Sequence, residues 1–169
     1  IIFGEKSVEV YTNTGNADFP FERISGAFIE TGCVAAHSVA KMDNSVFWLG
    51  ADDRGQGVVW RLDGYTPQRV STHAIEFAIQ GYSVISDAIA WTQQMEGHTF
   101  YWLTFPTGDA TWVYDAATQL WHQRAYTNPP DGVLKRHRAN CYAFFNGKHV
   151  VGDHTNGKIY ELDLALYSD

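Results

Sequence analysis

Apolar residues gather in short runs along the chain, separated by polar and mostly glycine-containing breaks. Four runs stand out, reading IIFG, FWLG, YWLT and HVVG, and they begin at Ile1, Phe47, Tyr101 and His149. Their starts lie 46, 54 and 48 residues apart, which indicates an internal repeat. After each run and break comes a second apolar segment: VEVYT, VVWRL, TWVYD or KIYEL. Short segments rich in aromatic and β-branched residues, bounded by turn residues, predict β-strands.

Further candidate strands complete the units. FERIS, QRVS and LWHQR follow in the first three units, and SVAKM (38–42), DAIAWT (87–92) and ANCYAF (139–144) precede the later apolar runs. The sequence therefore predicts units at about 1–25, 38–71, 85–125 and 138–169, with four short strands in each full unit. Units of about 50 residues with four strands are typical of β-propeller blades. We expect an all-β, propeller-like array of about three to four antiparallel blades in 1–169, either a single domain or an arc of one. A β-sandwich is the alternative.

Connectors join the units at about 26–37, 72–85 and 126–137. Apolar residues recur at helical spacing from Ile75 to Tyr82, which predicts a short helix in the second connector. The third connector contains NPPDG (128–132) and is predicted to be a loop.

All the tryptophans fall within predicted strands: Trp48, Trp60, Trp91, Trp102, Trp112 and Trp121. One small sheet cannot bury both of its faces alone, so neighbouring blades must stack. We therefore expect these rings to pack between blades. A stacking platform for sugars is the alternative.

The stretch WRLDGYTPQRVS (60–71) mixes an acid, two arginines and a tryptophan, as an active site can. However, Asp63 has a counterpart at Asp115 in the next unit, with a threonine three residues after each. A turn-forming residue is expected to recur in this way, and a catalytic residue is not. Asp63 and Gly64 are predicted to form a bend, with Trp60 packing toward a neighbouring blade. Replacing Asp63 with alanine is then expected to lower the melting temperature.

Charge and cysteine content restrict the function further. Acidic residues outnumber basic ones 19 to 12, which argues against general affinity for nucleic acid or anionic membrane. No apolar run approaches the ~20 residues of a membrane helix. The basic segment KRHR (135–138) could contact phosphate or an acidic partner, but a solvated loop is favoured in an acidic chain. Cys33 and Cys141 lack ligand spacing, so buried free thiols are expected, with a disulfide as the alternative.

Metal and cofactor chemistry has weak support. His149 and His154 flank a predicted hairpin with Asp153 nearby, but zinc sites usually need three or four ligands, so ordinary hairpin positions are favoured. The loop ADDRGQG (51–57) has the aspartates and glycines of a turn and lacks the spacing of a calcium loop. We expect no metal and no cofactor.

An enzymatic role also has weak support. Asp53 and Gly55 partly match the Asp-box of sialidase propellers, but Trp60 lies two residues too far on and Ala51 replaces a serine. Nucleophile elbows, phosphate loops and dinucleotide fingerprints are absent from the sequence. No catalytic or cofactor-binding residue is predicted.

Three long stretches carry a family resemblance. VEVYTNTGNADFPFERISGAFIETGC (8–33), DNSVFWLGADDRGQGVVWRLDGYTPQRVSTHAIE (43–76) and EGHTFYWLTFPTGDATWVYDAATQLWH (96–122) resemble the packaged-DNA stabilisation protein of short-tailed phages, the head-completion or tail-hub family. Because members of this family are longer and the chain opens on IIFGEKS without a methionine, we expect a fragment.

The resemblance implies a structural virion protein and not an enzyme. Such a protein acts after DNA packaging, joins the tail below the portal and its adaptor ring, helps seal the channel and provides a hub for the tail needle. The resemblance also implies a homo-oligomeric ring, commonly a hexamer, with no membrane and with packaged DNA at most nearby. The expected location is the virion tail, assembled in the bacterial host cytoplasm, and a prophage could encode the chain. A carbohydrate-binding or glycan-processing propeller is the alternative, motivated by the tryptophans and the partial Asp-box.

Overall fold

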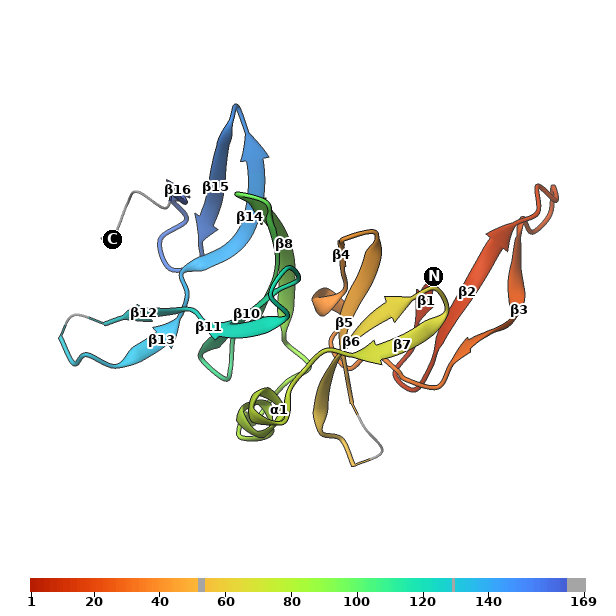
Figure 1. The fold of residues 1–169 in the computed structure, drawn as a ribbon, viewed down its shortest axis with the longest axis horizontal. Helices are drawn as coiled ribbons and strands as arrows, with labels where there is room; N and C mark the ends of the chain where they lie inside the picture. The colour runs from red at the N-terminus through yellow and green to blue at the C-terminus, as the bar shows by residue number, and fades with distance from the viewer. Residues whose placement is uncertain (52–53, 129, 164–169) are drawn as a thin grey trace.

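The computed structural model describes residues 1–51, 54–128 and 130–163. Over these residues the chain is mainly β, with antiparallel sheets that follow one another along the sequence in an open row (Figure 1). Together with the family described below, this architecture confirms the predicted all-β, propeller-like fold.

Four of the sheets are simple meanders in which strands adjacent in sequence pair with one another. Sheet 1 contains β1 (Ile2–Phe3), β2 (Val8–Asn13) and β3 (Phe21–Ile29). Sheet 2 contains β4 (Ala40–Met42), β5 (Ser45–Ala51), β6 (Gly57–Asp63) and β7 (Thr66–Arg69). Sheet 3 contains β8 (Ile89–Met95), β9 (His98–Phe105), β10 (Ala110–Asp115) and β11 (Leu120–Gln123). Sheet 4 contains β14 (Ala139–Phe145), β15 (Lys148–Asp153) and β16 (Ile159–Glu161).

The connectors have more structure than the sequence predicts. The first is shortened because β3 runs to Ile29, and it ends in a 3-10 helix at Ala36–Ser38. The second contains α1 (His73–Gln80), which confirms the predicted helix. The prediction that the third connector is a loop is wrong. In this connector β12 (Ala125–Thr127) pairs with β13 (Leu134–Arg136) to form a separate hairpin. At the end of this hairpin the Asn128 amide donates a hydrogen bond to the Val133 carbonyl oxygen at 3.0 Å.

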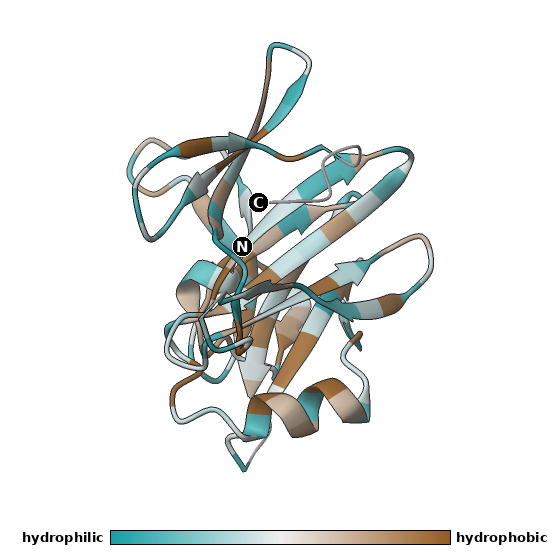
Figure 2. Cartoon of the chain, turned by 90° about the vertical axis from the view of Figure 1, so that its left-hand side faces the viewer, coloured by the Kyte–Doolittle hydropathy of each residue, from teal (hydrophilic) through white to brown (hydrophobic). Residues whose placement is uncertain are grey.

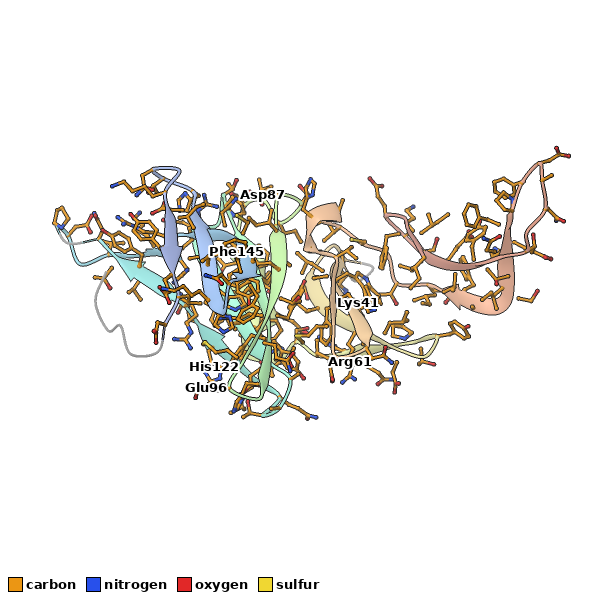
Figure 3. All side chains as sticks on the ribbon, turned by 90° about the horizontal axis from the view of Figure 1, so that it is seen from above. Lys41, Arg61, Asp87, Glu96, His122 and Phe145 are labelled. Atoms are coloured by element: carbon orange, nitrogen blue, oxygen red, sulfur yellow. The ribbon has the colours of Figure 1, made fainter. Side chains whose placement is uncertain are left out.

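Successive sheets pack face to face through apolar side chains, because alternate residues of a strand point to opposite faces. Figure 2 shows the resulting alternation of apolar and polar residues along the strands, and Figure 3 shows side chains filling the spaces between the sheets. The buried residues form three clusters. Between sheets 1 and 2 lie Val8, Ile29, Cys33, Trp48 and Leu62. Between sheets 2 and 3 the main residues are Phe47, Leu49, Val59, Tyr101, Leu103 and Tyr114, joined by Ile75 and Ile79 of α1. Between sheets 3 and 4 lie Trp91, Trp102, Val113, Ala139 and Val151.

The tryptophans belong to these interfaces. Every one of them lies in a strand, and none is exposed. Trp60 packs in the cluster between sheets 1 and 2, as predicted. Two indole N–H groups also bond across interfaces: Trp48 donates to the Gly32 carbonyl oxygen at 3.1 Å, and Trp121 donates to the Val70 carbonyl oxygen at 2.9 Å. Packing between blades is therefore confirmed, since all six tryptophans are buried or half-buried.

Candidate functional site

The basic segment 135–138 lies where β13 leads into β14, and acidic residues pair with two of its charges. Lys135 Nζ lies 3.1 Å from Asp109 Oδ2. The guanidinium of Arg138 lies 4.0 Å from the ring centroid of Tyr126 and 3.8 Å from the Asp153 carboxylate. The prediction of a loop is wrong for 135–136, because these residues belong to β13, which pairs with β12. Lys135 is exposed, as a solvated segment would be, and Arg138 is half-buried beside Asp153.

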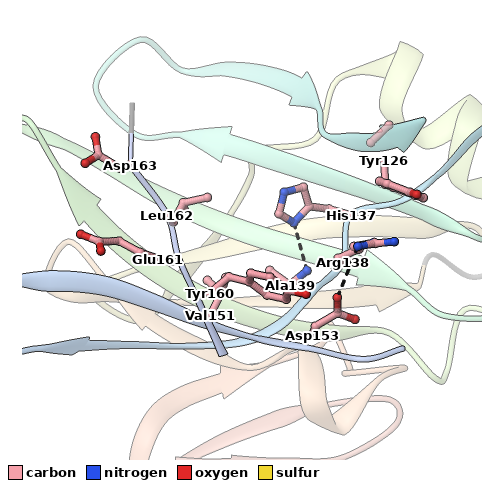
Figure 4. A pocket seen from close by; sticks show the side chains of 11 residues that line it. Tyr126, His137, Arg138, Ala139, Val151, Asp153, Tyr160, Glu161, Leu162 and Asp163 are labelled. Atoms are coloured by element: carbon pink, nitrogen blue, oxygen red, sulfur yellow. Dashed lines mark hydrogen bonds and ion pairs between the residues drawn. The ribbon is translucent and has the colours of Figure 1, made fainter. Parts of the chain in front are cut away.

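A cavity of about 360 Å³ lies beside this segment, between hairpin β12–β13 and sheet 4 (Figure 4). We call it the β16 cavity, and its lining residues are Ala125, Tyr126, His137, Arg138, Ala139, Val151, Asp153, Tyr160, Glu161, Leu162 and Asp163. A second cavity of about 480 Å³ adjoins it along sheet 3, and the two share His137, Leu162 and Asp163.

Asp153 is the most deeply buried acid of the β16 cavity, with a side chain that is 0% exposed. Its Oδ1 atom accepts hydrogen bonds from the amide and the hydroxyl of Thr155, each at 2.6 Å. Burial alone would raise the pKa of this carboxyl, but the Thr155 bonds and the nearby Arg138 charge lower it. Asp153 therefore remains a carboxylate at neutral pH, held in one orientation at the cavity wall.

The histidines of the metal hypothesis have other contacts. His149 Nδ1 lies 2.8 Å from the Tyr142 hydroxyl, and the His154 backbone amide donates to the Arg138 carbonyl oxygen at 3.1 Å. Burial, with a smaller contribution from the Arg136 charge, lowers the pKa of His154. Among the described residues, the structure gathers no group of three or more His, Cys, Asp or Glu side chains suited to a metal ion.

The loop 51–57 and the cysteines were also singled out from the sequence. Residues 52 and 53 lie outside the described residues, so the predicted turn and the Asp53 part of the Asp-box are not placed. Both cysteines are free thiols. Cys33 is buried as predicted, but Cys141 is exposed. The expectation of burial was wrong for Cys141 because it lies on the face of sheet 4 that points away from sheet 3.

The structure separates Asp63 from Asp115. Asp63 pairs with Thr66 across a two-residue loop, in which Gly64 adopts a φ of 59° that favours glycine. Asp115 instead begins a four-residue loop, and its Oδ2 accepts a hydrogen bond from the Thr118 hydroxyl at 2.9 Å. The two threonines at matching offsets therefore have different roles. Gly64 forms the first bend, and the Asp115 side chain organises the second.

Sequence reasoning missed a buried carboxylate on α1. Glu76 is 7% exposed, and its Oε1 accepts hydrogen bonds from Arg69 Nε and from the Ser71 hydroxyl, each at 2.6 Å. Burial opposes ionisation, but these bonds outweigh it and lower the pKa of Glu76. The ion pair between Arg69 and Glu76 connects β7 to α1 at the interface of sheets 2 and 3. The sequence signal was the helical periodicity, which places Glu76 beside Ile75 and Ile79.

Replacing Glu76 with glutamine is expected to reduce the free energy of unfolding by about 1–2 kcal/mol, because an amide cannot accept the charge-assisted bonds of Arg69. Urea unfolding at pH 7 measures the change. Glu22 to glutamine is the matched control, because Glu22 is exposed on β3. Equal losses for the two variants would contradict the role of Glu76.

The sheets and their interfaces define a class of protein: stacked antiparallel meanders with apolar interfaces, as in β-propellers. Residues 1–167 match the family model described as Bacteriophage P22 Gp10, beta-propeller. The chain belongs to this family of phage DNA-stabilisation proteins. No curated protein matches the chain. In the described part of the chain, no helix is long and apolar enough to span a membrane.

Family membership makes the chain a phage virion protein with the general role of stabilising packaged DNA at head completion. The sequence resemblance to this family is therefore confirmed.

Proposed function

We propose that the chain is part of the tail hub of a short-tailed phage, where it completes the head after DNA packaging. In this proposal it attaches below the portal and its adaptor ring, helps to seal the channel and provides an attachment point for the tail needle. The observation that carries the proposal is the family match, which spans nearly the whole chain at residues 1–167.

The proposed role is structural and does not involve catalysis. Aromatic and aliphatic side chains join the sheets into stiff interfaces, which suits a plug that must withstand the pressure of packaged DNA. Large apolar side chains are exposed at both ends of the row of sheets, and they are available for contacts with other subunits: Phe19, Phe21 and Phe28 in the sheet 1 region, and Phe144 and Phe145 in sheet 4. Subunits of a closed ring, such as the proposed hexamer, meet through two different surfaces.

Removing the gene from a phage that encodes this chain tests the proposal. We expect the mutant to package DNA and then to release particles that lose it, because the channel is left unsealed. Nuclease-protected DNA and electron microscopy of particles measure the loss, and a plasmid copy of the gene provides the control. Tailed, needle-bearing particles that retain their DNA without the protein would contradict the proposal.

A further inference from the structure

Three aromatic rings stack in parallel across the interface of sheets 3 and 4, and we call them the aromatic column. Trp91 of β8 lies opposite Trp102 of β9, with ring centroids 4.4 Å apart and an interplanar angle of 13°. Trp91 also stacks on Tyr142 of β14, with centroids 5.3 Å apart and an angle of 14°. Both indoles are buried, and Tyr142 is half-buried. Tryptophan and tyrosine are the aromatic side chains that lose an electron most readily, so the column is a continuous path for one-electron oxidation.

A proton acceptor lies at the Tyr142 end of the aromatic column. Tyr142 pairs with Val151 across sheet 4, and His149 lies two residues before Val151 on the same face. The Tyr142 hydroxyl is 2.8 Å from His149 Nδ1. Burial raises the pKa of Tyr142, so the phenol keeps its proton at neutral pH. In the imidazole tautomer that carries its hydrogen on Nε2, Nδ1 accepts from this phenol and is a base that can take its proton.

The two indoles of the column have no comparable base. Trp91 Nε1 is buried and has no hydrogen-bond partner in the described part of the chain. Trp102 Nε1 donates to Gln93 Oε1 at 3.2 Å, and a side-chain amide does not take up a proton. An indole that loses an electron here therefore stays a radical cation, which is a strong oxidant. Within the column, only Tyr142 can lose an electron and a proton together.

We propose that the aromatic column conducts one-electron oxidation from Trp102 and Trp91 to Tyr142. A one-electron oxidant such as the carbonate radical removes an electron from either indole. The indole radical cation takes an electron from Tyr142 as the phenol proton moves to His149, which leaves an intact indole, a neutral tyrosyl radical and an imidazolium. A soluble thiolate then gives one electron to the tyrosyl radical and becomes a thiyl radical, and His149 returns the proton to the phenolate.

The relay protects the packing of sheets 3 and 4. Oxygen added to either indole would introduce extra volume and a polar group into a buried interface, and both destabilise a close-packed core. Moving the oxidation to Tyr142 places it on a half-buried side chain that a soluble reductant can restore. This redox activity goes beyond the proposed structural function and does not rest on it.

Exposure of the full chain to carbonate radicals, followed by peptide mass spectrometry, tests the relay residue by residue. A nitroso spin trap marks the tyrosyl radical, and added oxygen marks a damaged indole. We expect trap adducts on Tyr142 and little oxygen on Trp91 and Trp102. Tyr142→Phe removes the adduct and is expected to raise oxygen addition at both indoles several-fold. Tyr65→Phe is the matched control and should leave both indoles unchanged, because Tyr65 is exposed and lies outside the column.

Two further variants interrupt the relay at different steps. Trp91→Phe keeps an aromatic ring but removes the central electron donor, so Tyr142 adducts should fall and oxygen addition at Trp102 should rise. His149→Gln keeps a hydrogen-bond acceptor that cannot take the proton. It should also reduce the Tyr142 adduct and increase indole oxidation. Circular dichroism and acrylamide quenching of tryptophan fluorescence are expected to match the wild-type chain.

Two outcomes would overturn the inference. An unchanged yield of Tyr142 adduct in both the Trp91 and the His149 variants would show that solvent oxidants attack Tyr142 directly. Indole oxidation that rises only in variants with increased acrylamide quenching would show that loosened packing, not a broken relay, exposes the rings. If Trp91→Phe fails to fold, His149→Gln alone decides the question. The gene-removal experiment is independent of all these measurements, so failure here is distinguishable from failure of the proposed function.

Discussion

Replacing Phe47 with alanine is expected to reduce the free energy of unfolding by about 3–5 kcal/mol, the usual cost of removing a buried aromatic ring. Phe47 is 0% exposed at the interface of sheets 2 and 3. Its ring centroid lies 5.5 Å from that of Tyr101 and 6.0 Å from that of Tyr114, both on sheet 3. The substitution therefore opens a cavity between two sheets and also removes two aromatic pairs.

Urea unfolding followed by tryptophan fluorescence measures this change, because tryptophans lie at each of the sheet interfaces. Phe77 to alanine is the matched control, since Phe77 is 72% exposed on α1 and the same ring is removed there without opening an internal cavity. We expect the control to change stability by less than about 0.5 kcal/mol. If both variants lose the same stability, the interface of sheets 2 and 3 does not hold the molecule together.

The position of Phe47 in this interface could be predicted from the sequence in outline. The apolar run FWLG and its counterparts recur at similar spacing, and only stacked sheets bury such runs in every unit. Alternation along the strand then places Phe47 and Leu49 on one face and Trp48 on the other. The structure assigns these faces to different neighbours, with Trp48 packed toward sheet 1 and Phe47 toward sheet 3.

Prediction from the sequence was wrong or incomplete where side-chain contacts and loop lengths determine the structure. Hairpin β12–β13 was missed because the prolines and glycine of NPPDG indicate a turn but do not show that its flanks pair. The β16 cavity was missed because its residues come from separate elements: Arg138 from the link between β13 and β14, Asp153 from β15 and Tyr160 from β16. No sequence spacing relates these residues, since tertiary packing alone brings them together.

The prediction that Asp63 and Asp115 occupy equivalent turns was also wrong, because the two hairpins have loops of different length. Both residues end a third strand and precede a threonine at the same offset, but one hairpin closes over two residues and the other over four. In the longer loop the aspartate must bond to the backbone to fix the turn. In the shorter loop Gly64 supplies the conformation by itself.

Asp115 to alanine is therefore expected to reduce the free energy of unfolding by about 2–3 kcal/mol, because the carboxylate is buried and leaves several donors without a partner. Asp115 is 3% exposed. It accepts hydrogen bonds from the Ala117 amide and the Thr118 hydroxyl, each at 2.9 Å, and it lies 2.8 Å from His98 Nδ1. Asp63 to alanine is the matched control. Asp63 is exposed, and its side chain makes no hydrogen bond within the described residues. Contrary to the expectation from the sequence, the melting temperature of the Asp63 to alanine variant should therefore stay unchanged.

The pH dependence of stability gives a second test of Asp115. Burial opposes ionisation, but the bonds from His98, Ala117 and Thr118 outweigh it and hold the folded pKa below the unfolded value of about 3.9. A lowered folded pKa means that the unfolded state binds the proton more readily, so this contribution is fully present above about pH 5 and is lost as the pH falls through the folded pKa. Asp115 to asparagine should therefore lose less stability than the wild-type chain between about pH 5 and pH 3 in urea unfolding. Parallel pH profiles for the two proteins would show that the carboxylate charge does not hold the turn.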